Sequence, residues 1–357
     1  MHRQTVAKKF ESMGGLISVE RNRLTVTRKG FEVEINSTAI ENLLPYAQAQ
    51  TQKAADAPGM IEHLIVTTKG HQARLALEPL AKRLTPSSTV TFIQNGMGVI
   101  DEINELYFPT PSWRPHYIVG IATHGLSSTP DGVFEPFTVV VNGVGTLKLG
   151  VLQPAAQPQS MPPSLIPSYD SLPPTTSYLL NSLVSAADLV ASHVSPQEVL
   201  CTQLEKLAIN AVINPLTVIF NCLNGTLLNN AHATKVIKLL LWEISQVLCA
   251  LPEMQSLPNK DLRFSTENLY NTVVRTARAT SENASSMLQD IRKGIPTEVD
   301  YINGYVVRKG LELKLPCSMN YMVQSMVKAK ERMAKIDRQR ELPIQGVEID
   351  LGADFKV

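Results

Sequence analysis

The spacing of apolar residues changes once along this chain, near residue 197. Before that point, short β-rich runs alternate with turns; after it, apolar residues recur at intervals of three and four. Strands predicted at 61–68 and 89–93 flank a helical segment at 71–83, and this order predicts a parallel sheet. Helices are predicted near 197–222, 230–251, 259–292, 297–313 and 319–340. The sequence therefore predicts an α/β domain followed by an all-α domain.

The first half of the chain contains further predicted strands and a proline-rich segment. Residues 15–36 read as two strands, and 117–123 and 137–141 as others. Residues 153–174 are rich in Pro, Ser and Gln, which predicts an irregular surface insertion. The expected organisation is an α/β domain at 1–195, a helical domain at 196–340 and a tail at 341–357.

Composition narrows the class of ligand. Lys plus Arg number 33 and Asp plus Glu number 32, so no basic excess points to nucleic acid or to an anionic membrane. No apolar run is long enough to cross a bilayer. The four cysteines show no metal-ligand spacing and are expected to be buried free thiols. A small molecule is the expected ligand, and no metal site is expected.

Two polar patterns stand out in the helical half. Lys206, Asn210 and Asn214 are four residues apart, so a helix places them on one face, and Pro215 is expected to end or kink that helix. Buried polar groups of this kind need partners, but a solvent-facing stripe on an amphipathic helix explains the spacing equally simply. Ser286 and Asp290 are also four residues apart, on a second helix face.

Glu298 follows shortly afterwards, in Thr297-Glu-Val-Asp-Tyr-Ile-Asn-Gly304. An acidic residue in the first turn of a helix is stabilised by the helix dipole, so capping alone could explain Glu298. From periodicity alone, neither pattern is decisive.

Four segments of this half resemble the ketopantoate reductase (2-dehydropantoate 2-reductase) family. The family pattern K-L-A-x-N-x-x-I-N-P-L-T corresponds to Lys206–Thr217, and N-x-x-N-G corresponds to Asn221–Gly225. S-S-M-x-x-D corresponds to Ser285–Asp290, and T-E-I-D-Y-I-N-G to Thr297–Gly304, with Val299 in place of isoleucine. The order of the motifs is far more specific than any one of them.

The first half resembles the same family. Val66–Gln72 is similar to its strand ending in K-x-x-Q, Gln94–Gly98 matches its Q-N-G-M-G loop, and Thr123–Gly125 matches its T-H-[AG] turn. The resemblance covers most of the chain and is interrupted by the Pro-rich insertion. It implies a Rossmann-like NADP-binding domain followed by a helical domain like that of 6-phosphogluconate dehydrogenase.

The resemblance also implies roles for individual residues. The family reduces a 2-oxo acid with NADPH, and Lys206 matches its catalytic lysine, which protonates the developing alkoxide. Glu298 matches the carboxylate that binds the substrate hydroxyl and orients this lysine. The matched substrate-binding positions are Asn210, Asn214, Asn224, Ser286 and Asp290. The matched cofactor-binding positions are Lys69, Asn95 and the backbone at Gly125.

Other conspicuous residues receive structural interpretations. His124 is expected to be structural rather than catalytic. Gly143, Gly145 and Gly150 lack the spacing of a dinucleotide fingerprint and are expected to mark a turn between strands. Trp113 and Trp242 are expected to be packing residues.

The chain departs from the family at its start. The family begins with a strand, a G-x-G-x-x-G turn, a helix and a second strand, and the turn cradles the pyrophosphate. This sequence has no such turn and starts where the second strand should end, so we expect that roughly 25–30 residues of a βαβ unit are absent. The Rossmann-like domain is thus truncated, and weak NADPH binding is expected. Arg3 matches, by position alone, the arginine that would pair with the 2′-phosphate of NADP.

The leading hypothesis is NADPH-dependent reduction of 2-dehydropantoate to pantoate, in pantothenate and coenzyme A biosynthesis, with Lys206 as the acid. Reduction of another 2-oxo acid is the first alternative. A non-catalytic binding or dimerisation module is the second, favoured by the missing fingerprint. A cytoplasmic protein is expected, with a mitochondrial one not excluded by the basic N-terminus, and a homodimer stays open.

Overall fold

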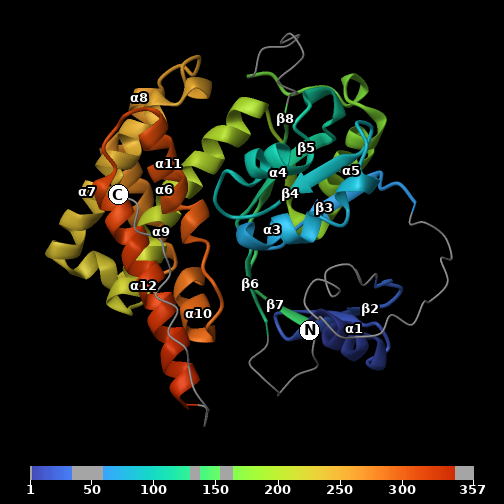
Figure 1. Ribbon diagram of the computed structural model, residues 1–357, viewed down its shortest axis with the longest axis horizontal. Coiled ribbons are helices and arrows are strands. Elements are labelled where there is room, and N and C mark those ends of the chain that lie inside the picture. The colour runs from blue at the N-terminus through green and yellow to red at the C-terminus, as the bar shows by residue number, and fades with distance from the viewer. Residues whose placement is uncertain (1, 34–58, 129–136, 153–163, 342–357) are drawn as a thin grey trace. The chain divides into compact units, whose positions relative to one another are not determined.

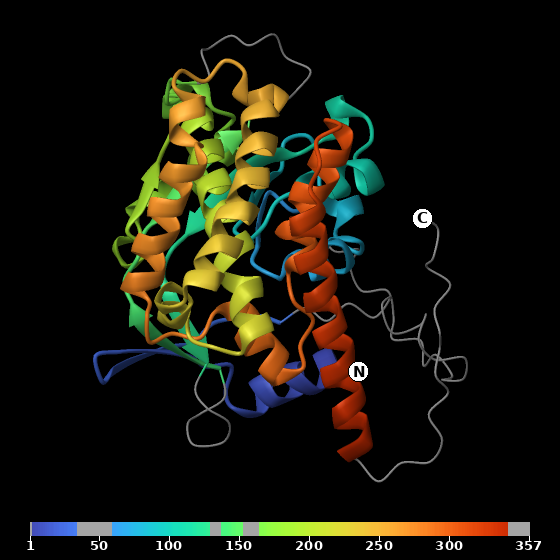
Figure 2. The same ribbon diagram turned by 90° about the vertical axis from the view of Figure 1, so that its left-hand side faces the viewer.

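The computed structural model in Figures 1 and 2 describes residues 2–33, 59–128, 137–152 and 164–341. The chain divides into two compact units, Met1–Gln203 (unit 1) and Leu204–Val357 (unit 2). Unit 1 combines helices with two sheets, and the described part of unit 2 is helical. The predicted order, an α/β domain followed by a helical domain, is confirmed.

The larger sheet of unit 1 has five strands in the order β3-β4-β5-β8-β9. Their bounds are His63–Val66 (β3), Thr89–Phe92 (β4), His116–Ala122 (β5), Leu147–Leu152 (β8) and Ala191–His193 (β9). β3, β4 and β5 are parallel, β8 is antiparallel to β5, and β9 is parallel to β8. Helix α3 (Gly70–Leu77) connects β3 to β4, so the predicted strand–helix–strand unit is confirmed.

Helices cover both faces of this sheet because side chains alternate along each strand. Ile118 and Leu149 pack with Leu180 of α5 (Pro174–Ser185) on one face. Val119 packs with Val199 on the other face. There the hydroxyl of Tyr117 donates a 2.6 Å hydrogen bond to Asn104 of helix α4, which spans Val99–Tyr107. Helix packing on both faces is typical of a sheet with a parallel core.

The second sheet has four strands in the order β2-β1-β7-β6. The strands span Ile17–Arg21 (β1), Leu24–Arg28 (β2), Gly125–Ser128 (β6) and Thr138–Gly143 (β7). β1 and β2 are the two strands predicted within 15–36, and they pair as an antiparallel hairpin. Helix α1 (His2–Ser12) lies against this sheet, where Phe10 meets Phe137 edge-on with ring centroids 5.0 Å apart.

The described end of the Pro-rich segment is exposed at most positions and packs against unit 1 at a few. Residues 153–163 lie outside the described residues, but Tyr169 and Leu172 pack against the cluster that α5 covers, and Pro167 is buried. The other residues of 164–172 are exposed, so this stretch is the predicted surface segment, anchored to unit 1 at these three positions. α5 itself was not predicted, because its prolines at 173 and 174 read as loop, although proline is compatible with the first turn of a helix.

Unit 2 is built from one long buried helix and the helices around it. Helix α6 spans Pro196–Phe220, and its residues from Leu204 onward belong to unit 2. The other helices span Ala231–Ala250 (α7), Lys260–Arg263 (α8), Thr266–Ala279 (α9), Ser286–Lys293 (α10), Asn303–Glu312 (α11) and Ser318–Glu341 (α12). Residues 211–218 of α6 are all buried. The single helical segment predicted at 259–292 is in fact three helices, α8, α9 and α10, because Ser265 and Ser285 each cap a new one.

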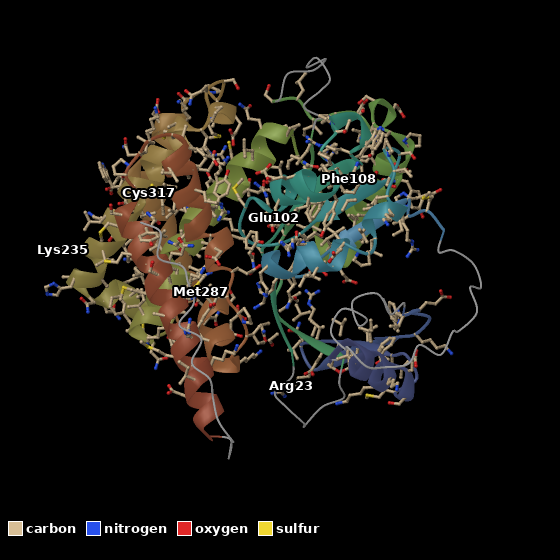
Figure 3. All side chains as sticks on the ribbon, viewed as in Figure 1. Arg23, Glu102, Phe108, Lys235, Met287 and Cys317 are labelled. Atoms are coloured by element: carbon tan, nitrogen blue, oxygen red, sulfur yellow. The ribbon has the colours of Figure 1, made fainter. Side chains whose placement is uncertain are left out.

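Smaller predictions have mixed outcomes. The four cysteines are free; Cys201 and Cys317, the latter labelled in Figure 3, are buried, while the other two are partly buried. The packing role predicted for the tryptophans is wrong: Trp113 is 70% exposed and Trp242 is 51% exposed. No helix in the described ranges is long and apolar enough to cross a membrane.

Candidate active site

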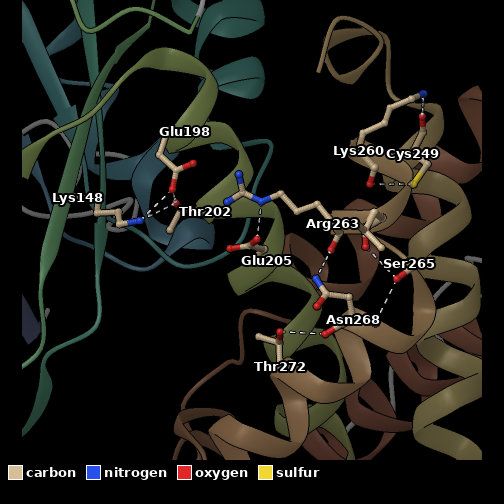
Figure 4. Close-up of polar contacts among 11 residues, drawn as sticks. Lys148, Glu198, Thr202, Glu205, Cys249, Lys260, Arg263, Ser265, Asn268 and Thr272 are labelled. Atoms are coloured by element: carbon tan, nitrogen blue, oxygen red, sulfur yellow. Dashed lines mark hydrogen bonds and ion pairs between the residues drawn. The ribbon is translucent and has the colours of Figure 1, made fainter. Parts of the chain in front are cut away.

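Helix α6 carries the first polar pattern into the interior of unit 2. Asn214 is buried, and Lys206 and Asn210 are partly buried. The solvent-facing stripe considered above is therefore wrong, because α6 is apolar on nearly all sides and most of its surface is covered. One residue before Lys206, Glu205 accepts a 2.7 Å bond from Arg263 of α8 (Figure 4).

The helix does not end at Pro215, which lies inside it, five residues before its last residue, Phe220. Thr217 makes a hydrogen bond beside this proline: its hydroxyl donates to the carbonyl of Asn214 at 2.8 Å. Because a hydroxyl has one proton, Ser285 must be the donor in the 2.7 Å contact between the Thr217 and Ser285 hydroxyls. Ser285 also caps α10 by accepting from the N–H of Leu288 at 3.1 Å.

Lys206 and Glu298 interact electrostatically within unit 2. Burial lowers the pKa of the Lys206 ammonium from its ordinary 10.5 to about 8, while the negative charge of Glu298 acts in the opposite direction. The side chain of Glu298 is only 7% exposed. An amine with this pKa can hold a proton near neutral pH and give it up to a stronger base, which is what a general acid requires.

Glu298 occupies the N-cap position of a short 3-10 turn at Val299–Tyr301, but its side chain makes no capping hydrogen bond there. The hydroxyl of Thr297 accepts from the N–H of Val299 at 3.4 Å. Its neighbours are held by α12 instead: the N–H of Thr297 donates to Glu331 at 2.5 Å, and Asp300 accepts from Gln324 at 2.7 Å and from Lys328 at 3.2 Å. A capping hydrogen bond from the side chain of Glu298 itself therefore does not explain this residue, and α12 holds the residues on either side of it in the sequence.

Asn224 lies against the segment between α9 and α10. Its N–H donates to the carbonyl of Asn283 at 3.0 Å, and its amide nitrogen donates to the hydroxyl of Thr280 at 2.9 Å. Gly225 approaches the same segment so closely that a Cβ would lie 2.6 Å from the side chain of Ser281. The amide oxygen of Asn224 is buried without a hydrogen-bond partner in the described structure, so it is available to a donor on a ligand.

The second polar pattern lies on α10. Ser286 is the first residue of the helix and is exposed, and Asp290 is partly buried one turn later. Their predicted spacing on one helix face is confirmed by the helix itself. Met287, which lies between them in the sequence and is labelled in Figure 3, is buried.

The predicted cofactor residues fall in unit 1. Lys69 immediately precedes α3 and Asn95 lies in the loop between β4 and α4, so both follow the carboxyl ends of neighbouring parallel strands. Gly125 is the first residue of β6. Arg3 lies in the first turn of α1, and its side chain is outside the described residues.

Three polar side chains beside these positions carry buried atoms without a hydrogen-bond partner among the described residues. In the described structure, the hydroxyl of Thr68, both ring nitrogens of His71 and the amide nitrogen of Gln94 are buried without a hydrogen bond. They follow β3 and β4 at the edge where ligands of parallel sheets bind. Orphaned donors and acceptors at this edge suit a polar, extended ligand such as a dinucleotide. Thr68, His71 and Gln94 were not predicted as site residues, because the burial of their atoms without partners depends on the tertiary structure.

His124 has the structural role predicted for it. Its Nδ1 accepts from the N–H of Gly145 at 3.1 Å, so its Nε2 must carry the proton and donate to the carbonyl of Leu189 at 2.9 Å. The ring thereby joins three segments of unit 1. Within the described residues, no group of three metal-ligating side chains could hold a metal ion.

Comparison with known proteins places these observations in a family. The model of ketopantoate reductase PanE/ApbA matches residues 16–154, and the model of its C-terminal part matches residues 198–331. The 2-dehydropantoate 2-reductase of Shigella flexneri is 31% identical over 268 residues, covering 75% of this chain and 74% of the relative. That of Saccharomyces cerevisiae is 29% identical over 299 residues, covering 79% and 76%.

Solved structures show the same fold. D-mandelate dehydrogenase with NADH and anilino(oxo)acetate has a TM-score of 0.65 at 19% identity, covering 92% of this chain and 89% of that one. The 2-dehydropantoate 2-reductase from Methylococcus capsulatus has a TM-score of 0.61 at 19% identity, covering 91% and 87%. At these identities the likeness concerns the fold, while the sequence matches carry the family.

Proposed function

This chain belongs to the ketopantoate reductase family, and from that premise we propose that it reduces 2-dehydropantoate to pantoate with NADPH. The observation that carries the proposal is the pair of Lys206 and Glu298. The lysine has a pKa of about 8 because it is buried, and it is under the influence of a nearly buried carboxylate. A proton donor of this strength suits a reaction in which a carbonyl oxygen becomes an alkoxide.

Each of the matched residues has a proposed role in catalysis or substrate binding. Lys206 donates its proton to the carbonyl oxygen and stabilises the negative charge that develops there. Glu298 keeps the lysine oriented and accepts a hydrogen bond from the substrate hydroxyl. Asn210, Asn214, Asn224 and Ser286 supply neutral donors and acceptors to the hydroxyl and carboxylate groups of the substrate, and Asp290 supports them.

A nicotinamide dinucleotide supplies the hydride in this reaction. Lys69, Asn95 and the backbone at Gly125 are the residues that would hold it, with Arg3 proposed for the 2′-phosphate. The orphaned atoms of Thr68, His71 and Gln94 support this assignment, because a bound polar ligand would satisfy them. They favour a dinucleotide without distinguishing NADPH from NADH, so both are to be compared.

The test is an assay of NADPH oxidation by the purified chain with 2-dehydropantoate. Lys206→Met should lower kcat by a factor of about 100 to 10,000, the usual contribution of a general acid. Lys235→Met is the matched control, because Lys235 is an exposed lysine on α7 of the same unit, labelled in Figure 3. Activity that survives Lys206→Met at the level of Lys235→Met would contradict the proposed role of Lys206.

The specificity is tested on a second substrate. The similarity in fold to a D-mandelate dehydrogenase favours a 2-oxo acid with an aromatic substituent as the alternative substrate. The assay therefore compares 2-dehydropantoate with 2-oxo-2-phenylacetate, each with NADPH and with NADH. A higher kcat/KM for the aromatic acid would replace the proposed substrate and leave the proposed chemistry in place.

A further inference from the structure

Pro215 leaves a defect in α6 that another helix repairs. Proline has no N–H, so the carbonyl of Ala211, four residues earlier, has no partner within the helix. Ala211 is completely buried, so bulk water does not reach it. The amide nitrogen of Asn303 donates to this carbonyl at 2.8 Å, and Asn303 is the first residue of α11. One buried side chain thus replaces the hydrogen bond that the proline removes.

Asn303 is itself held by a series of hydrogen bonds between buried side chains. Its amide nitrogen also donates to the amide oxygen of Asn320 at 3.1 Å, and the amide nitrogen of Asn320 donates to Glu243 at 2.8 Å. Glu243 further accepts the N–H groups of Met319 and Asn320 at 2.9 Å each, in the first turn of α12. The side chains of Glu243, Asn303 and Asn320 are 5% exposed or less.

The acceptors at the two ends of this series of hydrogen bonds fix the orientation of both amides. Glu243 accepts three N–H bonds, so Asn320 must turn its nitrogen toward it and its oxygen toward Asn303. Asn303 must then present its nitrogen, whose two protons go to Asn320 and to the carbonyl of Ala211. Reversing either amide would bring two acceptors together, so the arrangement has a single orientation.

The same bond joins the two halves of the candidate site in unit 2. Ala211 lies on α6 five residues after Lys206, and Asn303 lies five residues after Glu298. We propose that Asn303, oriented by Asn320 and Glu243, is a positioning residue that sets the distance between Glu298 and Lys206. Its consequence for turnover rests on the proposed function, whereas its effect on the lysine does not.

The sign of that effect follows from the two influences on Lys206. Burial lowers its pKa to about 8, and the charge of Glu298 raises it. If the segment carrying Glu298 moves away, burial remains and the opposing influence weakens. Loss of the Asn303 bond should therefore lower the pKa of Lys206 further. A residue that only stabilises the fold would leave this pKa unchanged.

The first experiment follows Lys206 in the full chain without substrate or cofactor. The protein is labelled with lysine carrying 13C at Cε, and the NMR signal that disappears in Lys206→Met is titrated. Glu298→Gln removes the carboxylate charge and should give the largest fall in pKa. Asn303→Leu, which is similar in size and makes no hydrogen bond, should increase the acid dissociation constant of Lys206 about tenfold, one pKa unit. An unchanged pKa in either variant would overturn the proposal.

A second variant separates positioning from simple stabilisation. Pro215→Ala restores an N–H at position 215, which can bond the carbonyl of Ala211 within α6. In the double variant Asn303→Leu with Pro215→Ala, the midpoint of thermal unfolding should recover toward that of Pro215→Ala alone. The pKa of Lys206 should stay low, because the link to the Glu298 segment is still missing. Recovery of both quantities would assign Asn303 a structural role only and overturn the proposal.

Glu243→Gln covers the case in which Asn303→Leu does not fold. Glutamine keeps the size of the side chain but can turn an N–H toward Asn320, so the orientation of the amides is no longer fixed. The pKa of Lys206 should fall in the same direction by a smaller amount, and no change would again overturn the proposal. Because Lys206 is titrated in the unliganded protein, a failure of 2-dehydropantoate reduction in the enzyme assay leaves this result unaffected.

Discussion

Two groups of buried polar side chains in this protein have opposite surroundings, one in each unit. In unit 2, Glu243, Asn303 and Asn320 are joined in a chain of hydrogen bonds that ends on α6. In unit 1, His71 and Gln94 follow the carboxyl ends of parallel strands with buried atoms that have no partner in the described structure. Polar groups paired within the protein contribute to its stability, whereas unpaired ones cost stability until a ligand binds. The difference separates a scaffold that sets geometry from a surface prepared for a ligand.

Glu243→Ala tests whether the paired polar groups of unit 2 stabilise it, and we expect the largest effect on stability from this change. The change removes the acceptor of three N–H groups and leaves a cavity, so unfolding should become easier by about 3–5 kcal/mol. Urea denaturation gives the value. Glu253→Ala, on an exposed residue of the same unit, should change it by less than about 0.5 kcal/mol. A similar small effect for both variants would remove the argument that the buried chain of hydrogen bonds holds unit 2 together.

The pH dependence of stability tests whether the pKa of Lys206 is lowered in the folded protein. Lys206 has a pKa of about 8 when folded against about 10.5 when unfolded, so the unfolded chain binds more protons between these values. Stability should therefore rise with pH across this window, because deprotonation removes the cost of a buried charge. Compared with Lys206→Met, the parent should gain on the order of 3 kcal/mol between pH 8 and 10.5.

The measurement is urea denaturation of both proteins at a series of pH values. The difference between the two proteins matters here, because other groups titrate in the same window and cancel. The parent should become more stable relative to Lys206→Met as the pH rises. If its relative free energy of unfolding stays constant or falls, the pKa of Lys206 is not lowered. Lys235→Met should follow the parent throughout, since Lys235 is exposed.

Motifs predicted the helical half better than the α/β half. Lys206, Asn210 and Asn214 needed only the regular spacing of a helix, and α6 provides it. Their proposed catalytic roles stay predictions. The sequence did not reveal that Asn303 repairs the defect at Pro215, because that bond joins residues 92 positions apart. It also missed α5, whose opening prolines indicated a loop although helix starts tolerate them.

Thr217→Val tests a second buried pair of unit 2, the hydrogen bond between Thr217 near the end of α6 and Ser285 at the start of α10. The change is nearly isosteric but leaves the carbonyl of Asn214 and the hydroxyl of Ser285 without their buried partner. Stability should fall by about 1–2 kcal/mol. Amide exchange at Leu288 should accelerate, because Ser285 caps α10 through that N–H. Thr226→Val, on an exposed threonine of the same unit, is the control, and equal effects on the two would mean that the Thr217–Ser285 contact is not a coupling between helices.

His71→Phe tests the unit 1 side, where the expected effect on stability is the smallest. Both ring nitrogens are buried without partners, so an apolar ring of similar size removes a cost and no hydrogen bond. The midpoint of unfolding should stay the same or rise slightly, in contrast to Glu243→Ala. Binding of NADPH, followed by fluorescence titration, should weaken if these atoms await the cofactor. A loss of stability with unchanged NADPH binding would mean that His71 stabilises the fold and does not bind the cofactor. The unpaired atoms of unit 1 would then no longer indicate a ligand site.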